Sequence, residues 1–238
     1  YHSKDMVQTN IFKLALYLFF FPKIFAGPVM KYKDFKCQLD YRKIDLEKIN
    51  SGVLRFIIGL GKKVIIANNL AYVVDSLYKI DTSYWTTPMA WLAIIGFALQ
   101  IYFDFSGYAD MAIGLGSMFG FNLPENFDHP YLAKRVGYFW RRWNMSLYAW
   151  FEEYLLLPLN GKNNSLIRKI ISLSFMTFLM GIWYGASANI ILWAIYIMFF
   201  IVIEALLLRN STINQIVDKV PSLIKHIYLL IVVIFGCK

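Results

Sequence analysis

The sequence is poor in charged residues and lacks the short motifs of several large enzyme classes. Only 16% of its 238 residues are charged, whereas a soluble domain carries about 25%, and this excludes a soluble globular protein. No HExxH motif, nucleotide-binding glycine loop or Ser/His/Asp arrangement is present. The two cysteines, Cys37 and Cys237, lack metal-ligand spacing, so neither a disulfide framework nor a metal site is expected.

Apolar side chains are abundant instead. Hydrophobic residues make up 58% of the sequence and aromatic residues 18%, which predicts an all-α, polytopic membrane protein with residues 1–238 in a single membrane domain. The formal net charge is +9, but the basic residues lie in short stretches between apolar runs, as in the loops of membrane proteins. We therefore expect membrane lipid, and no nucleic acid, as a partner.

The two ends of the sequence suggest part of a longer chain. It starts at Tyr1 without a signal region, and its last apolar run, Ile227 to Phe235, is well short of the ~20 residues that cross a bilayer. We expect further spans outside this sequence.

The first fifty residues are expected to be irregular. Lys13, Pro22 and the Gly27-Pro28 pair interrupt the apolar run from Ile11 to Met30, which predicts a broken or re-entrant segment. Residues 31–50 mix acidic and basic side chains and are expected to form a solvated cytoplasmic loop.

Charged residues also occur inside apolar stretches. Gly52 to Tyr78 contains Arg55, Lys62 and Lys63, so this stretch either packs inside a bundle or lies at the membrane interface.

A cleaner span follows at residues 88–103 and leads into Asp104, Ser106 and Asp110. Six positions apart, the two carboxylates do not share a helical face and do not predict a general acid/base pair. They either cap a turn at Ser106-Gly107 or are buried functional groups.

The stretch 136–154 predicts an amphipathic helix. At helical spacing its tryptophans fall on one arc, and Arg141, Asn144, Tyr148 and Glu152 form a polar stripe on another. The helix either lies at the membrane surface or turns the stripe toward a buried, water-containing site.

The region 170–208 predicts two helices. Its 34 residues from Ile170 to Ile203 carry no charge, and one helix of that length would be about 51 Å long, against a hydrocarbon core of about 30 Å. The glycines in residues 181–187 mark the expected break.

Five blocks of sequence, taken in order, carry a resemblance to a known family. They are FFPKIFAGPV (Phe20 to Val29), GLGKKVIIANNLA (Gly59 to Ala71), YFDFSGYADMAIGLGSMFGFNLPENFDHPYL (Tyr102 to Leu132), FWRRWNMSLYAWF (Phe139 to Phe151) and GIWYGASANIILW (Gly181 to Trp193). Together they resemble the membrane-bound O-acyltransferase family, in particular its bacterial alginate-acetylation branch.

The resemblance implies a multi-helix bundle around an acyl-transfer tunnel, with this chain as the middle portion. It implies an O-acyltransferase that moves an acyl group, expected to be acetyl, from a cytoplasmic thioester donor to a hydroxyl acceptor on a cell-surface polysaccharide. The expected donor is acetyl-CoA or an acyl carrier, no bound cofactor is expected, and an extracytoplasmic acetyltransferase is the expected partner. The implied location is the bacterial cytoplasmic membrane, crossed several times.

Two positions depart from the family pattern. The family has histidine after RRW, where this chain has Asn144, and histidine in its GxWHGA motif, where this chain has Tyr184. The resemblance makes these two the candidate catalytic positions. The same blocks supply the candidate tunnel and support residues Asp104, Ser106, Asp110, Arg141, Arg142, Trp143 and Trp183.

The two replacements leave two functions open. Neutral imidazole, with a pKa of about 6.5, accepts a proton at pH 7, whereas an amide cannot and a phenol with a pKa of about 10 is mainly a donor. The first function is acyl transfer that relies on acceptor geometry or on a lowered pKa of Tyr184. The second is a catalytically impaired relative that acts as a membrane scaffold or acyl-donor-binding subunit.

Overall fold

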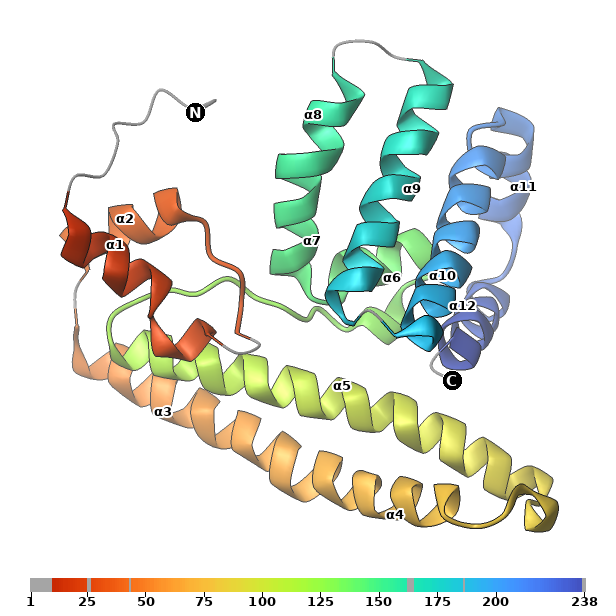
Figure 1. The fold of residues 1–238 in the computed structure, drawn as a ribbon, viewed down its shortest axis with the longest axis horizontal. Helices are drawn as coiled ribbons and strands as arrows, with labels where there is room; N and C mark the ends of the chain where they lie inside the picture. The colour runs from red at the N-terminus through yellow and green to blue at the C-terminus, as the bar shows by residue number, and fades with distance from the viewer. Residues whose placement is uncertain (1–9, 25–26, 43, 162–164, 186, 237–238) are drawn as a thin grey trace. The chain divides into compact units, whose positions relative to one another are not determined.

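The structure is a computed structural model that describes residues 10–24, 27–42, 44–161, 165–185 and 187–236. Helices and turns account for the described parts, apart from one isolated β-bridge (Figure 1). The chain forms two compact units, and each is described by itself. The first comprises Tyr1–Ala67 and Phe103–Glu125, and the second comprises Asn68–Tyr102 and Asn126–Lys238.

Four helices are long and apolar enough to cross a membrane. They are Leu46–Tyr78, which joins α3 (Leu46–Gly61), the π-helical η2 (Lys62–Ala67) and α4 (Asn68–Tyr78); α5 (Thr87–Met118); α9 (Leu166–Trp183); and α10 (Ala188–Leu207). A fifth span is possible by length and composition if α11 (Ser211–Lys219) and α12 (Ser222–Gly236), bent by 104°, count as one. The prediction of an all-α membrane protein is confirmed.

The solvated loop predicted for residues 31–50 is wrong. The first unit begins with α1 (Ile11–Leu18), η1 (Phe21–Lys23) and α2 (Tyr32–Tyr41), and Asp45 caps the start of α3 by accepting a hydrogen bond from the Lys48 amide at 2.8 Å. Phe35 on α2 is fully buried and stacks on Phe121, with ring centroids 4.9 Å apart. Phe35 and Leu39 give α2 an apolar face at i and i+4 spacing, which the surrounding charges conceal in the composition.

Glycines bring α3 and α5 into backbone contact within the first unit. A Cβ atom on Gly52 would lie 2.7 Å from the Gly114 carbonyl oxygen, and one on Gly59 would lie 2.5 Å from that of Gly107. The two glycines on each helix are seven residues apart and meet in opposite order, so α3 and α5 pack as an antiparallel pair. Any larger side chain there would force the helices apart.

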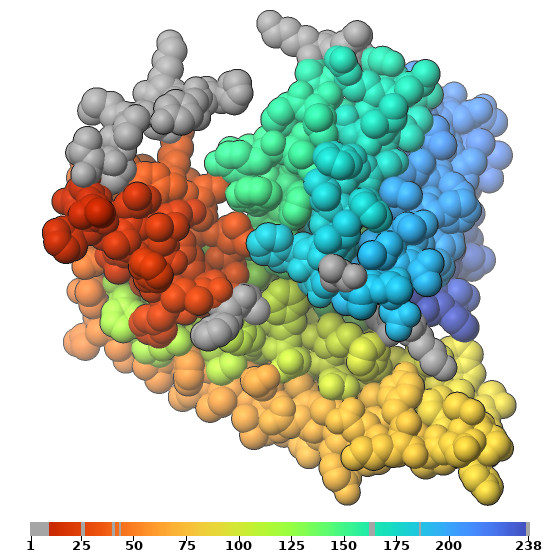
Figure 2. Space-filling model, viewed as in Figure 1, coloured from red at the N-terminus to blue at the C-terminus, as the bar shows by residue number. Residues whose placement is uncertain are grey.

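The second unit holds the remaining elements. Besides α4, α9, α10, α11, α12 and the first half of α5, these are η3 (Thr82–Tyr84), η4 (Pro130–Leu132), α6 (Val136–Arg142), α7 (Met145–Phe151), η5 (Glu152–Leu156) and α8 (Leu157–Asn160). Helices α9 and α10 lie side by side (Figures 1 and 2). A Cβ atom on Gly181 would meet that of Ala194, so the two helices touch closely near their connection.

The predicted break near residues 181–187 coincides with the connection between α9 and α10. Helix α9 ends at Trp183, and Ser187 caps α10 by accepting a hydrogen bond from the Ile190 amide at 3.4 Å. Tyr184 is therefore the residue directly after the last residue of α9.

Candidate active site

The continuous helix predicted for residues 136–154 is wrong, because the chain breaks between α6 and α7. Asn144 adopts a left-handed conformation, with φ 48° and ψ 54°. Asparagine and histidine are among the few residues that tolerate this conformation. The 3.6-residue spacing of apolar side chains continues from α6 into α7, so the periodicity of the sequence does not reveal the break.

A neighbouring segment holds the break in place. Phe127 forms an isolated antiparallel bridge with Trp143, the Asp128 amide donates to the Arg142 carbonyl at 3.1 Å, and the Met145 amide donates to the Asn126 carbonyl at 2.9 Å. These bonds replace helical ones and fix the backbone on both sides of Asn144.

The side chain of Asn126 completes this support. It is buried, and its Oδ1 accepts hydrogen bonds from the Ser146 amide at 3.3 Å and from the Ser146 hydroxyl. Asn126 thus caps the first turn of α7 from outside the helix, where free amides need acceptors. These hydrogen bonds therefore fix the positions of Trp143 and Asn144 at the break.

Asn144 and Tyr184, 40 residues apart, are in direct contact. The Asn144 Nδ2 donates a hydrogen bond to the Tyr184 Oη at 3.2 Å, and the Trp143 side chain hydrogen-bonds to the same phenol. Asn144 is only 5% exposed. The structure therefore brings together the two positions where the family resemblance places histidine.

Burial decides the protonation of this phenol. Desolvation raises the pKa of Tyr184, and the hydrogen bonds from Asn144 and Trp143 only partly offset it. This direction is opposite to the lowered pKa of Tyr184 on which acyl transfer could rely. Because amide and indole N–H groups donate to Oη, its own proton stays available for donation.

A cavity of about 330 Å³ lies beside the pair. Its walls are mainly aromatic and aliphatic, with Trp193 in edge-to-face contact with both Trp140 and Tyr184 at centroid distances of 5.4 and 5.8 Å. Its lining contains no carboxylate, lysine, arginine or histidine among the described residues. Such a concave, apolar space with a few polar atoms is typical of a small-molecule site.

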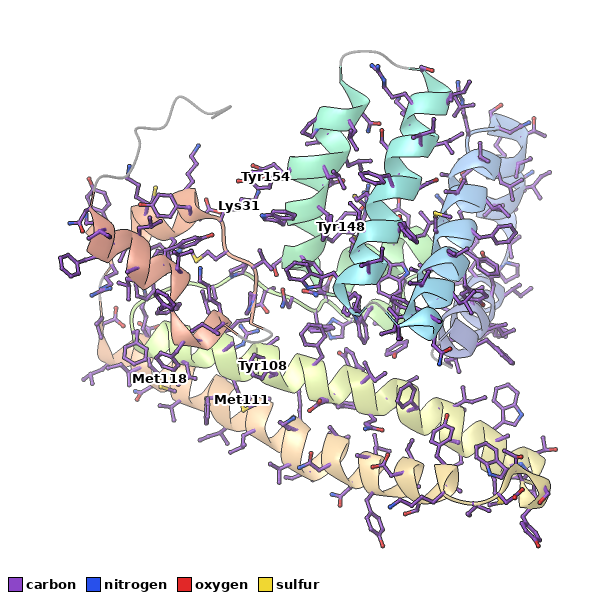
Figure 3. All side chains as sticks on the ribbon, viewed as in Figure 1. Lys31, Tyr108, Met111, Met118, Tyr148 and Tyr154 are labelled. Carbon is purple, nitrogen blue, oxygen red and sulfur yellow. The ribbon has the colours of Figure 1, made fainter. Side chains whose placement is uncertain are left out.

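The two arginines of the motif face away from this cavity. Arg141 donates to the Tyr148 hydroxyl at 3.1 Å and to Glu152 at 3.5 Å, and Tyr148 lies on the side of α7 that faces α9 (Figure 3). Arg142 lines a separate, basic cavity of about 500 Å³ together with Arg135 and other cations. Arg141, Tyr148 and Glu152 of the predicted polar stripe thus contact one another, but the arginines do not touch the cavity beside Tyr184.

Of the two predicted tryptophans, Trp143 and Trp183, only one lines the cavity beside Tyr184. Trp143 lines the cavity and contacts Tyr184. Trp183 is 65% exposed and does not line it.

The predicted carboxylates belong to the first unit and pair with cations of α3 and η2. Asp110 accepts from Arg55 at 2.9 Å and from Lys62 at 2.6 Å, and Asp104 pairs with Lys63. These pairs show that the part of the charged stretch from Arg55 to Lys63 packs against another helix within this unit.

The predicted turn at Ser106-Gly107 is wrong, since both residues lie inside α5. Ser106 is buried, and its hydroxyl has no hydrogen-bond partner among the described residues.

Two residues of the site were missed by the sequence reasoning. Trp140 was assigned only to an apolar arc, and Trp193 was quoted only within a motif block. Both line the cavity. Their positions inside the blocks FWRRW and GIWYGASANIILW, which carry the family resemblance, were the available signal.

Comparison with known proteins adds a family. A family model described as MBOAT, membrane-bound O-acyltransferase family, matches residues 2–238. The chain is 36% identical over 236 residues to the "Probable alginate O-acetylase AlgI" of Pseudomonas aeruginosa, covering 99% of this chain and 44% of that protein.

Two further relatives carry other names. The chain is 38% identical over 189 residues to a "Peptidoglycan O-acetyltransferase" of Helicobacter pylori, covering 76% of this chain and 35% of the relative. It is 28% identical over 202 residues to a "Teichoic acid D-alanyltransferase" of Bacillus subtilis, covering 79% and 50%. The chain thus spans half or less of the length of these relatives.

Proposed function

The chain belongs to the membrane-bound O-acyltransferase family, and from that premise we propose that it transfers an acyl group, acetyl by preference, from a thioester donor to a hydroxyl of a cell-surface polysaccharide. The observation that carries the proposal is the hydrogen-bonded pair of Asn144 and Tyr184 beside a largely aromatic cavity. The names of the relatives, which specify alginate, peptidoglycan and teichoic acid, support an envelope polymer as acceptor.

The chemistry assigned to Tyr184 is hydrogen-bond donation. The acceptor oxygen attacks the thioester carbonyl carbon, the carbon–sulfur bond breaks, and the acceptor proton ends on the departing thiolate. Negative charge develops on the carbonyl oxygen, and the Tyr184 O–H stabilises it, because a donor fixed in a dry site acts more strongly there than in water. Asn144 and Trp143 hold the phenol oxygen without competing for its proton.

The setting follows from the same premise. The protein lies in the bacterial cytoplasmic membrane, the acyl group enters from the cytoplasm on acetyl-CoA or an acyl carrier, and the product passes along a tunnel toward an extracytoplasmic acetyltransferase partner. The spans of the chain and the bacterial origin of the relatives support this arrangement.

A second function is favoured by one observation. None of the described residues that line the cavity titrates near neutral pH, so the cavity could hold an acyl donor without catalysing transfer. The chain would then be a donor-binding subunit or membrane scaffold.

One assay separates the two functions. Membranes from cells that make the protein receive labelled acetyl-CoA or labelled acetyl carrier, and label in polymer is measured for the wild type, Tyr184→Phe and Tyr184→His. Loss of one such donor typically lowers the rate about 100- to 1,000-fold, so transfer by the wild type should collapse in Tyr184→Phe. A silent wild type that becomes active in Tyr184→His would establish the second function.

Asn144→His gives a further comparison. Histidine tolerates the left-handed conformation at this position, so the variant should fold.

Equal transfer rates in the wild type and the Tyr184→Phe variant would contradict the role given to the phenol.

A further inference from the structure

A second, much smaller pocket opens from the wall of the cavity. It has a volume of about 20 Å³, and Trp140, Tyr184, Trp193 and Ile197 line both spaces. A site needs about 10–15 Å³ measured in this way to hold one water-sized group. The pocket therefore has room for one or two groups of that size and no more.

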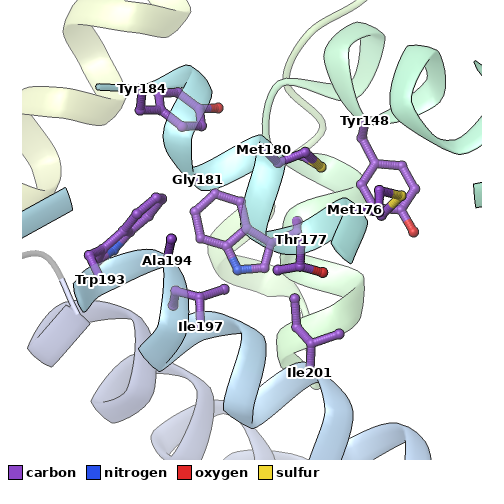
Figure 4. Close-up of a pocket in the computed structure, with 11 residues that line it drawn as sticks. Tyr148, Met176, Thr177, Met180, Gly181, Tyr184, Trp193, Ala194, Ile197 and Ile201 are labelled. Carbon is purple, nitrogen blue, oxygen red and sulfur yellow. The ribbon is translucent and has the colours of Figure 1, made fainter. Parts of the chain in front are cut away.

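The walls of this pocket come mainly from α9 and α10, with Trp140 of α6 and Tyr148 of α7. Figure 4 shows Tyr184 and Trp193 toward one end, and Tyr148 and Ile201 toward the other. The only hydroxyl on the α9 wall, that of Thr177, donates to the Leu173 carbonyl at 2.9 Å within its own helix. The interior is consequently apolar and suited to a hydrocarbon group.

Large side chains line the far end of the pocket. Met176 is fully buried, and Tyr148 is held by the hydrogen bond from Arg141. At the near end, the close contact between Gly181 and Ala194 leaves no space between the helices. A longer hydrocarbon chain would have to displace one of these groups.

Trp140 contributes an unused hydrogen-bond donor to the shared wall. It is 8% exposed, and its indole nitrogen has no acceptor among the described residues. An indole N–H can only donate, and a buried donor without a partner is uncommon in native proteins. A ligand oxygen at the wall would satisfy it.

From these two observations we propose that the small pocket is the acyl subsite. The methyl group of an acetyl donor occupies the pocket, and an oxygen of the donor accepts the Trp140 N–H. The subsite restricts the donor to two-carbon acyl groups and makes Met176 a specificity-determining residue. This inference rests on the proposed function and adds the acyl length to it.

The test compares donor lengths in the unaltered protein first. Membranes receive acetyl, propionyl or butyryl thioester of one carrier, and the transfer rate of each is measured. One methylene in an apolar pocket changes the rate about 10- to 200-fold, so the rate should fall at least tenfold beyond acetyl. Equal rates for all three donors would overturn the subsite while leaving the proposed function intact.

Enlarging the pocket should relax this limit. Met176→Ala should raise the butyryl-to-acetyl rate ratio about tenfold or more. Met198→Ala on α10 is the matched control, since Met198 does not line the pocket, and should leave the ratio unchanged. An active Met176→Ala variant with the wild-type ratio would contradict the assignment, and the donor series in the wild type decides it if that variant does not fold.

Trp140→Phe tests the donor separately. It keeps an aromatic ring and removes the N–H, so both acetyl and butyryl transfer should slow by about tenfold or more while their ratio stays the same. Undiminished acetyl transfer would show that the indole has no part. Absence of transfer for every donor in the wild type would overturn the proposed function, and this subsite with it.

Discussion

The helix interface of the first unit and the cavity of the second treat charge in opposite ways. Charged side chains meet across α3, η2, α5 and the segment after α5, and each has an opposite partner: Arg55, Lys62, Lys63, Asp104, Asp110 and Glu125. The cavity beside Tyr184 is lined by aromatic, aliphatic and amide side chains. Ionised groups in membrane helices are costly unless paired. The charged side chains of the first unit therefore serve to hold its helices together.

This difference indicates where chemistry is possible. In the first unit Asp104, Asp110 and Glu125 each pair with a cation. In the second unit Tyr184, Asn144 and Trp140 carry polar atoms that stay neutral at pH 7 and can be buried without a counter-ion. The replacement of both family histidines makes this contrast complete.

The strongest way to break the packed region is to add volume at its glycines. Gly59→Val places side-chain carbons within 2.5 Å of the Gly107 carbonyl oxygen, where backbone must move, and overpacking costs about 1–3 kcal/mol, occasionally more, with backbone clashes at the upper end. We expect no folded protein in detergent by size-exclusion chromatography. Gly61→Ala is the control, because a Cβ there meets nothing within 4 Å, and a folded Gly59→Val would show that the helices do not touch.

Removing one shared carboxylate should be the next largest effect. Asp110→Asn keeps the shape but withdraws the charge that pairs with both Arg55 and Lys62, at a side chain only 15% exposed. Breaking such a buried pair costs about 3 kcal/mol, measured as a lower melting temperature. Glu125→Gln removes the other partner of Arg55 at an exposed position and should cost less than about 1 kcal/mol; equal losses would mean that burial does not matter here.

Sequence reasoning found the charged region but not its partners. Arg55 among aliphatic residues signalled a special environment, yet Asp110 lies 55 positions away and no spacing rule joins them. Helix α2 was missed because its charges hide the single apolar stripe through Phe35. Composition reports what a segment contains, whereas burial depends on what packs against it.

The site was predictable in part and for a different reason. Asn144 and Tyr184 became candidates only through the family resemblance, and their contact is set by the break that residues 126–128 stabilise. The unpaired N–H of Trp140 could not be predicted, because hydrogen-bond satisfaction depends on three-dimensional neighbours.

The protonation of Tyr184 offers a test of the neutral region. Because burial raises its pKa, ultraviolet difference titration of wild type against Tyr184→Phe should show less phenolate from this residue at pH 10 than a free phenol gives. Above pH 10 the unfolded chain releases phenol protons and folded Tyr184 keeps its own. The unfolded state then binds fewer protons, and the free energy of unfolding falls as pH rises.

The same property predicts a pH profile. Acetyl transfer by the wild type should show no inflection from Tyr184 between pH 6 and 9, whereas Tyr184→His should introduce one below pH 6.5, because the same burial lowers the pKa of an imidazole. A wild-type inflection near pH 8 that follows phenolate absorbance would make Tyr184 a base and remove the contrast between the two regions.

The smallest expected effect concerns Arg141, which donates a hydrogen bond to Tyr148 at the far end of the small pocket. Arg141→Gln removes the hydrogen bond to the Tyr148 hydroxyl and should lower stability by about 1 kcal/mol, with a slight rise in the butyryl-to-acetyl ratio as the end wall loosens. Arg142→Gln is matched in sequence and chemistry, but Arg142 lines the separate basic cavity and lies 3.8 Å from Asp128, so both quantities should stay at their wild-type values. If Arg141→Gln instead abolished transfer and left stability unchanged, a charge would act in the reaction itself, and the second unit would no longer be a site that works with neutral groups alone.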